Sequence, residues 1–468
     1  MTQNSLIRAI NSNSSLTENG MSTFSSSMNH NVDLFFKFGA RRGSDIIPAF
    51  SKAFSEDKTI ATRIALWGRD AREGSGERQL FRDILKYLID TDVEIASRVL
   101  SRIPELGRWD DLYVAFGTKL ENQAKIMFKT AIEEKNGLAA KWIDRKGPNA
   151  NILRKYLKMD PKTYRKTLVE LTKVVEQQMC AKEFDKIEFE KVPSLAHSRY
   201  TKAFHRNAPD EYQKYLNGLV KGETKINVGA IYPYDIIKSM KQFGKSKATT
   251  AIEQWKALPN YSEESQKIIT VVDVSGSMAQ RIGNNQNLLA IDVALSLGLY
   301  FSDKMEGTFK DCFITFSSTP KLQMLKGDIF DKMLQLNQSE WGMSTNLEAV
   351  FNLLLDSAVK GNVPENDMPT MILIMSDMEF NACCKYPGAK AFEMIGKKYE
   401  DAGYKIPNVI FWNIASRHET NVPVEYKEKG VGLVSGFSPS IIKSILSAKQ
   451  ITPLAILIET IGKERYNF

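Results

Sequence analysis

The stretch Ile268-Ile-Thr-Val-Val-Asp-Val-Ser-Gly-Ser277 decides the fold of the second half of this 468-residue chain. Its first five residues are apolar or β-branched and predict a buried strand that ends at Asp273. Similar runs lie at 313–316, 371–375 and 409–414, and helical patterns at 288–301, 347–355 and 391–401 lie between or beside them. Short apolar strands that alternate with helices predict an α/β, doubly wound, mostly parallel sheet covered on both faces.

The pattern before this sheet is helical. From about residue 32 to 240, apolar residues recur at three- and four-residue steps, and Gly and Pro separate short runs. Successive short helices with tight turns predict an all-α module of HEAT-like repeats. We therefore expect a flexible Ser- and Asn-rich lead-in at 1–30, a helical repeat module at 31–262 and the α/β domain at 263–468.

Oxygen-bearing side chains cluster at the predicted carboxyl ends of strands. Asp273, Ser275 and Ser277 alternate directly after the first strand, Asp377 follows the 371–375 strand, and Thr345 precedes a helix. Ligands of open α/β sheets bind at this edge, and hard oxygen donors suit a small hard cation such as Mg²⁺. A metal-free fold, in which Asp273 caps the following helix, is the alternative.

These residues carry a family resemblance. Residues from about 266 to 468 resemble a von Willebrand factor A domain, a Rossmann-like fold, with a metal-ion-dependent adhesion site. The resemblance implies that Asp273, Ser275, Ser277, Thr345 and Asp377 hold Mg²⁺ or another divalent cation, although Ser344 could replace Thr345. It also implies that the ion binds an acidic side chain of a protein partner and that no covalent chemistry occurs.

The positive charge is confined to the front of the chain. Residues 1–260 hold 43 Lys and Arg against 31 Asp and Glu, a net charge of +12, whereas residues 261–468 carry −4. An excess of Lys and Arg on one domain is compatible with phosphate binding and equally with a solvated surface of no special purpose. The densest cluster, our candidate RNA-binding surface, comprises Lys141, Arg145, Lys146, Arg154, Lys155, Lys158, Lys162, Arg165 and Lys166. Tyr156 and Tyr164 lie within it and either stack on bases or point into the core.

Three blocks of the helical region carry a second resemblance. Leu34-Phe-Phe-Lys-Phe-Gly39, Trp67-Gly-Arg-Asp-Ala-Arg-Glu-Gly-Ser-Gly-Glu-Arg78 and Gly107-Arg-Trp-Asp-Asp-Leu112 resemble the helical module of the TROVE/Ro family. That family combines a ring of HEAT-like repeats with an A domain and binds RNA. Lys225-Ile-Asn-Val-Gly-Ala-Ile-Tyr-Pro-Tyr234 resembles an uncharacterised relative with the same plan in viruses and plants.

The charged residues of the 67–78 block allow two interpretations. Arginine forks bind phosphate in a two-pronged fashion, so Arg69, Arg72 and Arg78 could form a phosphate cradle. We favour an internal ion-pair network that fixes neighbouring helices, because each arginine has a carboxylate nearby in sequence. For the same reason we expect Trp109 to be buried.

Composition excludes several other classes of protein. No apolar run is long enough to span a membrane, and four cysteines in 468 residues form no disulfide framework. The chain lacks the GxxxxGK[ST] and HExxH motifs. We therefore expect a cytoplasmic, non-enzymatic RNA-binding protein of ribonucleoprotein type, without a small-molecule substrate and virion-associated if viral. The alternative is a structural or assembly protein that uses the metal site for protein contacts and never binds RNA.

Overall fold

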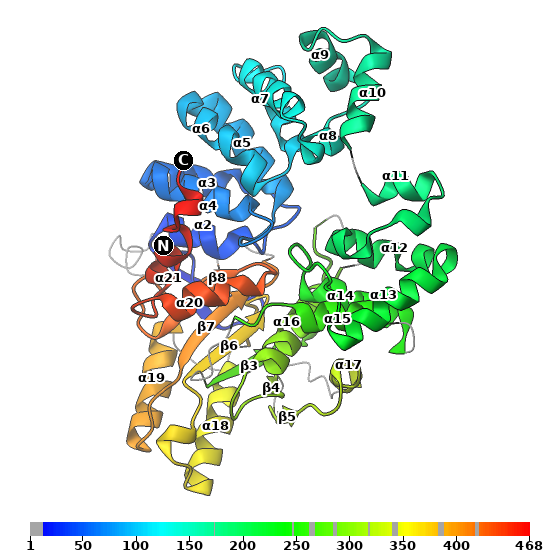
Figure 1. Ribbon diagram of the computed structural model, residues 1–468. Coiled ribbons are helices and arrows are strands. Elements are labelled where there is room, and N and C mark those ends of the chain that lie inside the picture. The colour runs from blue at the N-terminus through cyan, green and yellow to red at the C-terminus, as the bar shows by residue number, and fades with distance from the viewer. Residues whose placement is uncertain are drawn as a thin grey trace.

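The computed structural model describes residues 13–172, 174–245, 248–261, 267–283, 288–316, 319–338, 345–381, 388–416 and 421–468. Figure 1 shows a helical first part and a second part built around a sheet. This confirms the predicted order of a helical region followed by an α/β region. No described helix is both long and apolar enough to cross a membrane.

The large sheet has six strands in the order β5-β4-β3-β6-β7-β8. Their bounds are β3 (Ile268–Val272), β4 (Cys312–Thr315), β5 (Leu322–Met324), β6 (Met371–Ser376), β7 (Asn408–Asn413) and β8 (Val431–Ser435). All neighbouring pairs are parallel except β4 with β5. Every residue of β3 and β6 is buried, as expected for parallel strands covered on both faces. The sequence patterns predicted β3, β4, β6 and β7 but missed the short edge strand β5 and the Gly- and Ser-containing β8.

Helices cover both faces of this sheet. Phe411 of β7 contacts Phe392, whereas the next residue, Trp412, contacts Phe301. Successive strand residues point to opposite faces, so the helices that carry Phe392 (α19) and Phe301 (α16) lie on opposite sides. The helices of this region are α16 (Ala290–Lys304), α17 (Ile329–Gln338), α18 (Leu347–Gly361), α19 (Gly388–Asp401), α20 (Ile442–Ser447) and α21 (Pro453–Ile461).

The N-terminal helices form an arc that starts and ends on the sheet region. Helix α2 packs on β8, and α14 packs on α16 (Figure 1). The first helices of the arc are α2 (His30–Phe38), α3 (Ile47–Glu56), α4 (Lys58–Arg69), α5 (Arg78–Thr91), α6 (Val93–Leu106), α7 (Glu121–Glu133) and α8 (Gly137–Trp142). The others are α9 (Pro148–Tyr156), α10 (Pro161–Leu171), α11 (Val175–Cys180), α12 (Ser194–Asn207), α13 (Pro209–Lys221), α14 (Pro233–Phe243) and α15 (Thr249–Ala257).

Two hydrophobic cores hold the molecule together. The larger is continuous from Val32 of α2 through Leu168 of α10 and into the sheet region. The smaller lies between α11 and α13 and centres on aromatic residues such as Phe189, Phe204 and Tyr212. Because α2 and the sheet share one core, the helical and α/β regions bury apolar surface against each other.

Residues 13–30 of the predicted lead-in are folded against the rest of the protein. Strands β1 (Ser14–Leu16) and β2 (Ser22–Phe24) form an antiparallel hairpin. The hydroxyl of Thr17 donates to the carbonyl of Phe380 at 2.6 Å, and that of Thr23 donates to the carbonyl of Val422 at 2.6 Å. The Ser- and Asn-rich composition of residues 1–30 suggested a flexible segment. It could not reveal these hydrogen-bond partners, because they lie more than 350 residues away in the chain.

Candidate functional site

The turn after β3 holds three of the predicted cation ligands together. The backbone N–H of Asp273 donates to the carbonyl of Met375 at 2.9 Å, which extends the β3–β6 ladder to the carboxylate. Oδ1 of Asp273 accepts the N–H of Ser275 at 2.9 Å. A 3-10 turn then begins at Gly276, and Oγ of Ser275 lies 2.9 Å from Oγ of Ser277. The alternation in the sequence thus aims one carboxylate and two hydroxyls at a common place.

The neighbouring strand β6 supplies the second carboxylate. Because β3 and β6 are adjacent and parallel, Asp377 emerges beside Asp273. Ser376 donates its hydroxyl to Oδ2 of Asp273 at 2.5 Å, and the N–H of Glu379 donates to Oδ1 of Asp377 at 3.3 Å. The hydroxyl of Ser277 also hydrogen-bonds to Asp377. Asp273, Ser275, Ser277 and Asp377 are therefore brought together.

The surroundings of the two carboxyl groups disfavour the ionised form of each, so both pKa values are raised. Burial raises the pKa of Asp273. Burial, followed by the nearby charge of Asp273, raises the pKa of Asp377 to about 7. Within the described parts of the chain, no Lys or Arg is among the groups that shift either pKa. A bound cation would remove this repulsion, and the donor set of two carboxylates and two hydroxyls fits a hard divalent ion.

The fifth predicted ligand, Thr345, is connected to the other four residues through the loop that follows Asp377. Its hydroxyl is 3.0 Å from the carbonyl O of Glu379 and 3.1 Å from Oδ1 of Asn381. These bonds join Thr345 to the loop that follows Asp377, and through that loop to the other four residues. The alternative ligand Ser344 lies outside the described residues.

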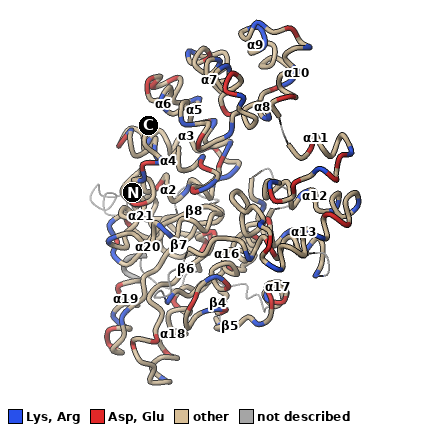
Figure 2. Tube along the Cα trace, viewed as in Figure 1, with Lys and Arg blue, Asp and Glu red and all other residues tan. Residues whose placement is uncertain are grey.

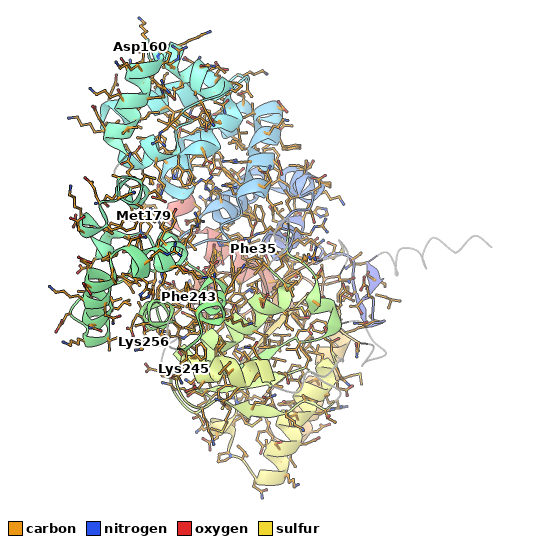
Figure 3. The ribbon with its side chains drawn as sticks, turned by 90° about the vertical axis from the view of Figure 1, so that its right-hand side faces the viewer. Phe35, Asp160, Met179, Phe243, Lys245 and Lys256 are labelled. Atoms are coloured by element: carbon orange, nitrogen blue, oxygen red, sulfur yellow. The ribbon has the colours of Figure 1, made fainter. Side chains whose placement is uncertain are left out.

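The predicted RNA-binding residues lie on α8–α10 and the turns between them. Figure 3 shows Asp160, between α9 and α10, at the end of the molecule farthest from the sheet. Residues 137–171 hold nine Lys and Arg and three Asp and Glu, a net charge of +6. Figure 2 colours the positions of Lys and Arg along this part of the trace blue. We call the nine cations the basic surface.

Many side chains of the basic surface lack an acidic partner. The side chains of Lys146, Lys155, Lys158 and Lys162 are exposed and form no hydrogen bond or ion pair with the described residues. The remaining contacts are weak or neutral. Lys141 and Lys166 lie 3.9 Å from Glu176 and Glu170, and Arg145, Arg154 and Arg165 donate to Thr172, Met159 and Pro161 oxygens.

The two tyrosines of this region do not behave alike. Tyr164 is 2% exposed, and its hydroxyl donates to the carbonyl of Asp144 at 2.9 Å. Tyr156 is half-buried, with the ammonium of Lys125 5.2 Å from its ring centroid. Tyr164 therefore points into the core, so it is not available to stack on a base.

Similarities to known proteins extend over most of the chain. Two family models match the chain: a domain of unknown function (DUF2828) over residues 116–273 and another (DUF7788) over residues 267–463. The uncharacterized protein L728 of Acanthamoeba polyphaga mimivirus is 28% identical over 96% of this chain and 87% of its own length. The relative is viral. This confirms the expected resemblance to an uncharacterised viral protein.

A solved structure aligns with most of this chain. The crystal structure of the Deinococcus radiodurans RO (RSR) protein aligns with a TM-score of 0.49 and 13% sequence identity. The alignment covers 88% of this chain and 93% of the other.

Several arginines are paired with carboxylates within the protein. Arg69, 5% exposed at its side chain, lies 2.7 Å from Asp111, and Arg82 lies 2.6 Å from the same carboxylate. The other pairs join Arg42 to Glu77, Arg82 and Arg108 to Asp110, and Arg465 to Asp70. We call this set the arginine–carboxylate network. It fits the internal interpretation for Arg69, although its partner comes from a distant segment rather than from within the 67–78 block. Arg72 and Arg78 are exposed, so for these two arginines the internal interpretation stays a prediction. Trp109 is buried, as predicted.

Glu379 is a residue of the site that sequence reasoning missed. It is 1% exposed, and its carboxylate accepts the N–H of Glu18 and the side-chain amide of Asn421, both at 2.7 Å. Its carbonyl accepts the amide of Asn19 at 2.7 Å. Glu379 thereby ties the N-terminal hairpin to the loop that carries Asp377. Its place two residues after Asp377 was the available signal, but its partners lie far away in sequence.

Proposed function

We propose that this protein is a non-enzymatic RNA-binding protein whose basic surface contacts RNA phosphates. The observation that carries this proposal is the set of four exposed lysines, Lys146, Lys155, Lys158 and Lys162, without acidic partners among the described residues. Exposed cations of this kind release counterions when phosphates approach, which gives affinity that depends little on sequence. The resemblance of three sequence blocks to the TROVE/Ro family supports the same proposal.

The second part of the proposal concerns the sheet edge. We infer that Asp273, Ser275, Ser277 and Asp377, with Thr345 beside them, hold Mg²⁺ or another divalent cation. When bound, such an ion offers a focused positive charge to an oxygen ligand from outside. The chain's own residues position that charge at the carboxyl ends of β3 and β6, where an acidic side chain of a protein partner can approach.

Covalent chemistry at this edge is not part of the proposal. A serine nucleophile needs an adjacent base to take its proton. The hydroxyl of Ser275 lies 2.9 Å from the hydroxyl of Ser277, which is no base, and also hydrogen-bonds to the carboxyl group of Asp273, which the proposal assigns to the cation. The arrangement favours binding over group transfer.

Charge reversal on the basic surface tests the RNA proposal. Lys155→Glu, Lys158→Glu and Lys162→Glu combined should weaken binding of a single-stranded RNA by at least about tenfold, because three phosphate contacts become repulsive. A matched control reverses three exposed lysines of the sheet region: Lys360→Glu, Lys397→Glu and Lys405→Glu. This control changes the net charge equally and should leave the affinity within about twofold.

Two results would contradict the RNA proposal. One is the absence of RNA binding by the wild-type protein at low salt. The other is an equal loss of affinity in both triple variants, which would mean that net charge alone is responsible. Either result would favour the alternative, an assembly protein that uses its cation site for protein contacts.

A further inference from the structure

The N-terminal hairpin lies against the loop that follows β6. The hairpin comprises β1, β2 and the turn at residues 17–21 between them, and the loop comprises residues 377–381. The hydroxyl of Thr17 donates to the carbonyl of Phe380 at 2.6 Å. The ring of Phe380 is buried, and its centroid lies 5.7 Å from that of Phe411 in β7. This loop residue therefore contacts the sheet through its side chain and the hairpin through its backbone.

Glu379 extends this contact to a candidate ligand. Its buried carboxylate accepts the N–H of Glu18 at 2.7 Å, and its carbonyl accepts the side-chain amide of Asn19 at 2.7 Å. The N–H of Glu379 donates to Oδ1 of Asp377 at 3.3 Å. A buried carboxylate is tolerated only where donors surround it, so the hairpin helps to fix the place of Glu379 and, through it, of Asp377.

The same loop holds the fifth predicted ligand. The N–H of Asn381 donates to the carbonyl of Thr345 at 3.1 Å, and the hydroxyl of Thr345 lies 3.0 Å from the carbonyl O of Glu379. Asn381 also pairs with Gly20 of the hairpin in an isolated antiparallel β-bridge. The turn of the hairpin thus contacts the residues that hold two candidate ligands, Asp377 and Thr345.

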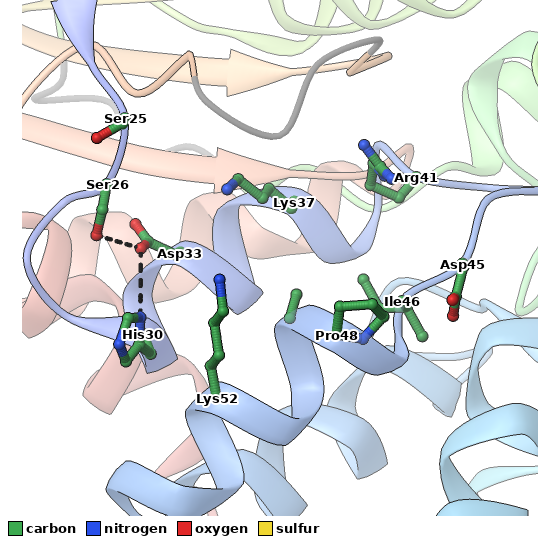
Figure 4. A pocket seen from close by; sticks show the side chains of 11 residues that line it. Ser25, Ser26, His30, Asp33, Lys37, Arg41, Asp45, Ile46, Pro48 and Lys52 are labelled. Atoms are coloured by element: carbon green, nitrogen blue, oxygen red, sulfur yellow. Dashed lines mark hydrogen bonds and ion pairs between the residues drawn. The ribbon is translucent and has the colours of Figure 1, made fainter. Parts of the chain in front are cut away.

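The other end of the hairpin is anchored on the helical region. Just after β2, the hydroxyl of Ser26 donates to Oδ2 of Asp33 in α2 at 2.6 Å, as Figure 4 shows, and the N–H of Ser27 donates to Oδ1 at 2.7 Å. Strand β2 is held further by two backbone bonds between Phe24 and Val422, at 3.0 and 2.9 Å. Because this end is fixed, the turn presents a fixed set of donors to the loop.

We propose that the N-terminal hairpin is a positioning element of the candidate cation site, and that hairpin docking and cation binding strengthen each other. This inference rests on the proposed cation site. Residues that hold the ligands of a metal ion typically change its affinity by about 10- to 100-fold when they are replaced. Glu379 is such a residue, and the hairpin supplies two of its donors. Coupling between two sites is reciprocal, so a bound cation also favours the docked hairpin.

Calorimetric titration of the full chain with Mg²⁺ tests the effect of the hairpin on the site. Thr17→Val removes a bond to the loop and should weaken Mg²⁺ binding by about fivefold, the effect of one hydrogen bond. Asn19→Ala removes an exposed side chain, leaves the core intact and should have a similar effect.

Thr23→Val is the matched control. Thr23 is also buried, and its hydroxyl donates at 2.6 Å to the carbonyl of Val422, outside the 377–381 loop. The backbone bonds between Phe24 and Val422 keep β2 in place in this variant. Thr23→Val should lower the melting temperature as much as Thr17→Val does, but its Mg²⁺ affinity should stay within about twofold of the wild type.

Hydrogen exchange of the hairpin amides tests the reciprocal effect. Mg²⁺ should slow exchange of the N–H groups of Glu18 and Met21, which donate to Glu379 and Thr17, by at least about fivefold. Exchange in α5, which lies outside the site, should slow less. In Asp273→Asn, Mg²⁺ should leave exchange of the hairpin unchanged. A hairpin that only stabilises the fold would exchange at a rate that does not depend on Mg²⁺.

The outcomes separate the role of the hairpin from the existence of the cation site. Mg²⁺ binding by the wild-type protein with unchanged affinity in both Thr17→Val and Asn19→Ala would overturn the role of the hairpin and leave the site standing. An equal loss of affinity in Thr17→Val and Thr23→Val would also overturn it, because general destabilisation would then be the cause. If the wild-type protein binds no Mg²⁺, the cation site itself is wrong, and the proposal is wrong with it.

Discussion

The basic surface and the arginine–carboxylate network both contain cations of the helical region, but these cations have different surroundings in the two regions. Asp111 of the network is fully buried and holds Arg69 and Arg82 at 2.7 and 2.6 Å. On the basic surface, Lys155 and Lys158 are exposed and have no partner among the described residues. A buried cation must be paired to be tolerated, whereas an exposed and unpaired cation remains available to a ligand. Charge density in the sequence does not separate these cases, but burial does.

Breaking the network should have the largest effect on stability. Asp111→Ala leaves the buried guanidinium of Arg69 without its partner and should lower the free energy of unfolding by about 3–5 kcal/mol. Urea unfolding followed by circular dichroism measures this change. Lys155→Ala on the basic surface is the matched comparison and should change stability by less than about 0.5 kcal/mol. Equal effects of the two substitutions would remove the distinction between the regions.

A smaller effect is expected at the candidate cation site. Mg²⁺ at a hundredfold excess over its Kd should stabilise the wild-type protein by about 2.7 kcal/mol, since the ion binds the folded form. Thermal unfolding with Mg²⁺ and with a chelator measures this shift. Asp273→Asn should abolish the shift, and the exposed control Asp401→Asn should keep it. A shift that persists in Asp273→Asn would refute the ligand assignment.

The same site predicts how the metal-free protein responds to pH. The pKa of Asp377 is raised to about 7 in the fold, from an ordinary value near 3.8, so the folded state holds a proton that the unfolded state releases. With chelator present, stability should therefore decline as pH rises from about 4 to about 7. Melting curves across this range should show a weaker decline in Asp377→Asn. If the stability of Asp377→Asn declines with pH as steeply as that of the wild type, a group other than Asp377 causes the decline.

The smallest effect on stability is expected for Tyr164, which lies beneath the basic surface. Tyr164→Phe removes the hydroxyl that donates to Asp144 and should cost about 1 kcal/mol of stability. Because Tyr164 is buried, RNA affinity should remain unchanged in a gel-shift titration. A tenfold loss of affinity without unfolding would show that this ring contacts RNA after all.

The sequence predicted the sheet and the grouping of four oxygen-bearing side chains at its edge because local patterns control both. Apolar strand runs locate β3 and β6, and parallel neighbours bring Asp273 and Asp377 to one edge. Partners distant in the chain were not predictable in this way. Glu379 with Glu18 and Arg465 with Asp70 are joined by the tertiary fold across more than 350 residues, and no periodicity records such pairs.

The sequence predicted the basic surface as a cluster of charges, but it did not predict which side chains are buried or lie near a carboxylate. Density along the chain found all nine cations. It gave no means to tell that Tyr164 is buried or that Lys141 lies near Glu176.

The salt dependence of RNA binding tests the central claim most directly. For single strands, each phosphate contact contributes about −0.7 to the slope of log K against log salt concentration. The account predicts a steep negative slope for the wild-type protein and a slope shallower by about 2 when Lys155, Lys158 and Lys162 are reversed together. Parallel slopes for the two proteins would contradict the claim that these exposed lysines contact RNA.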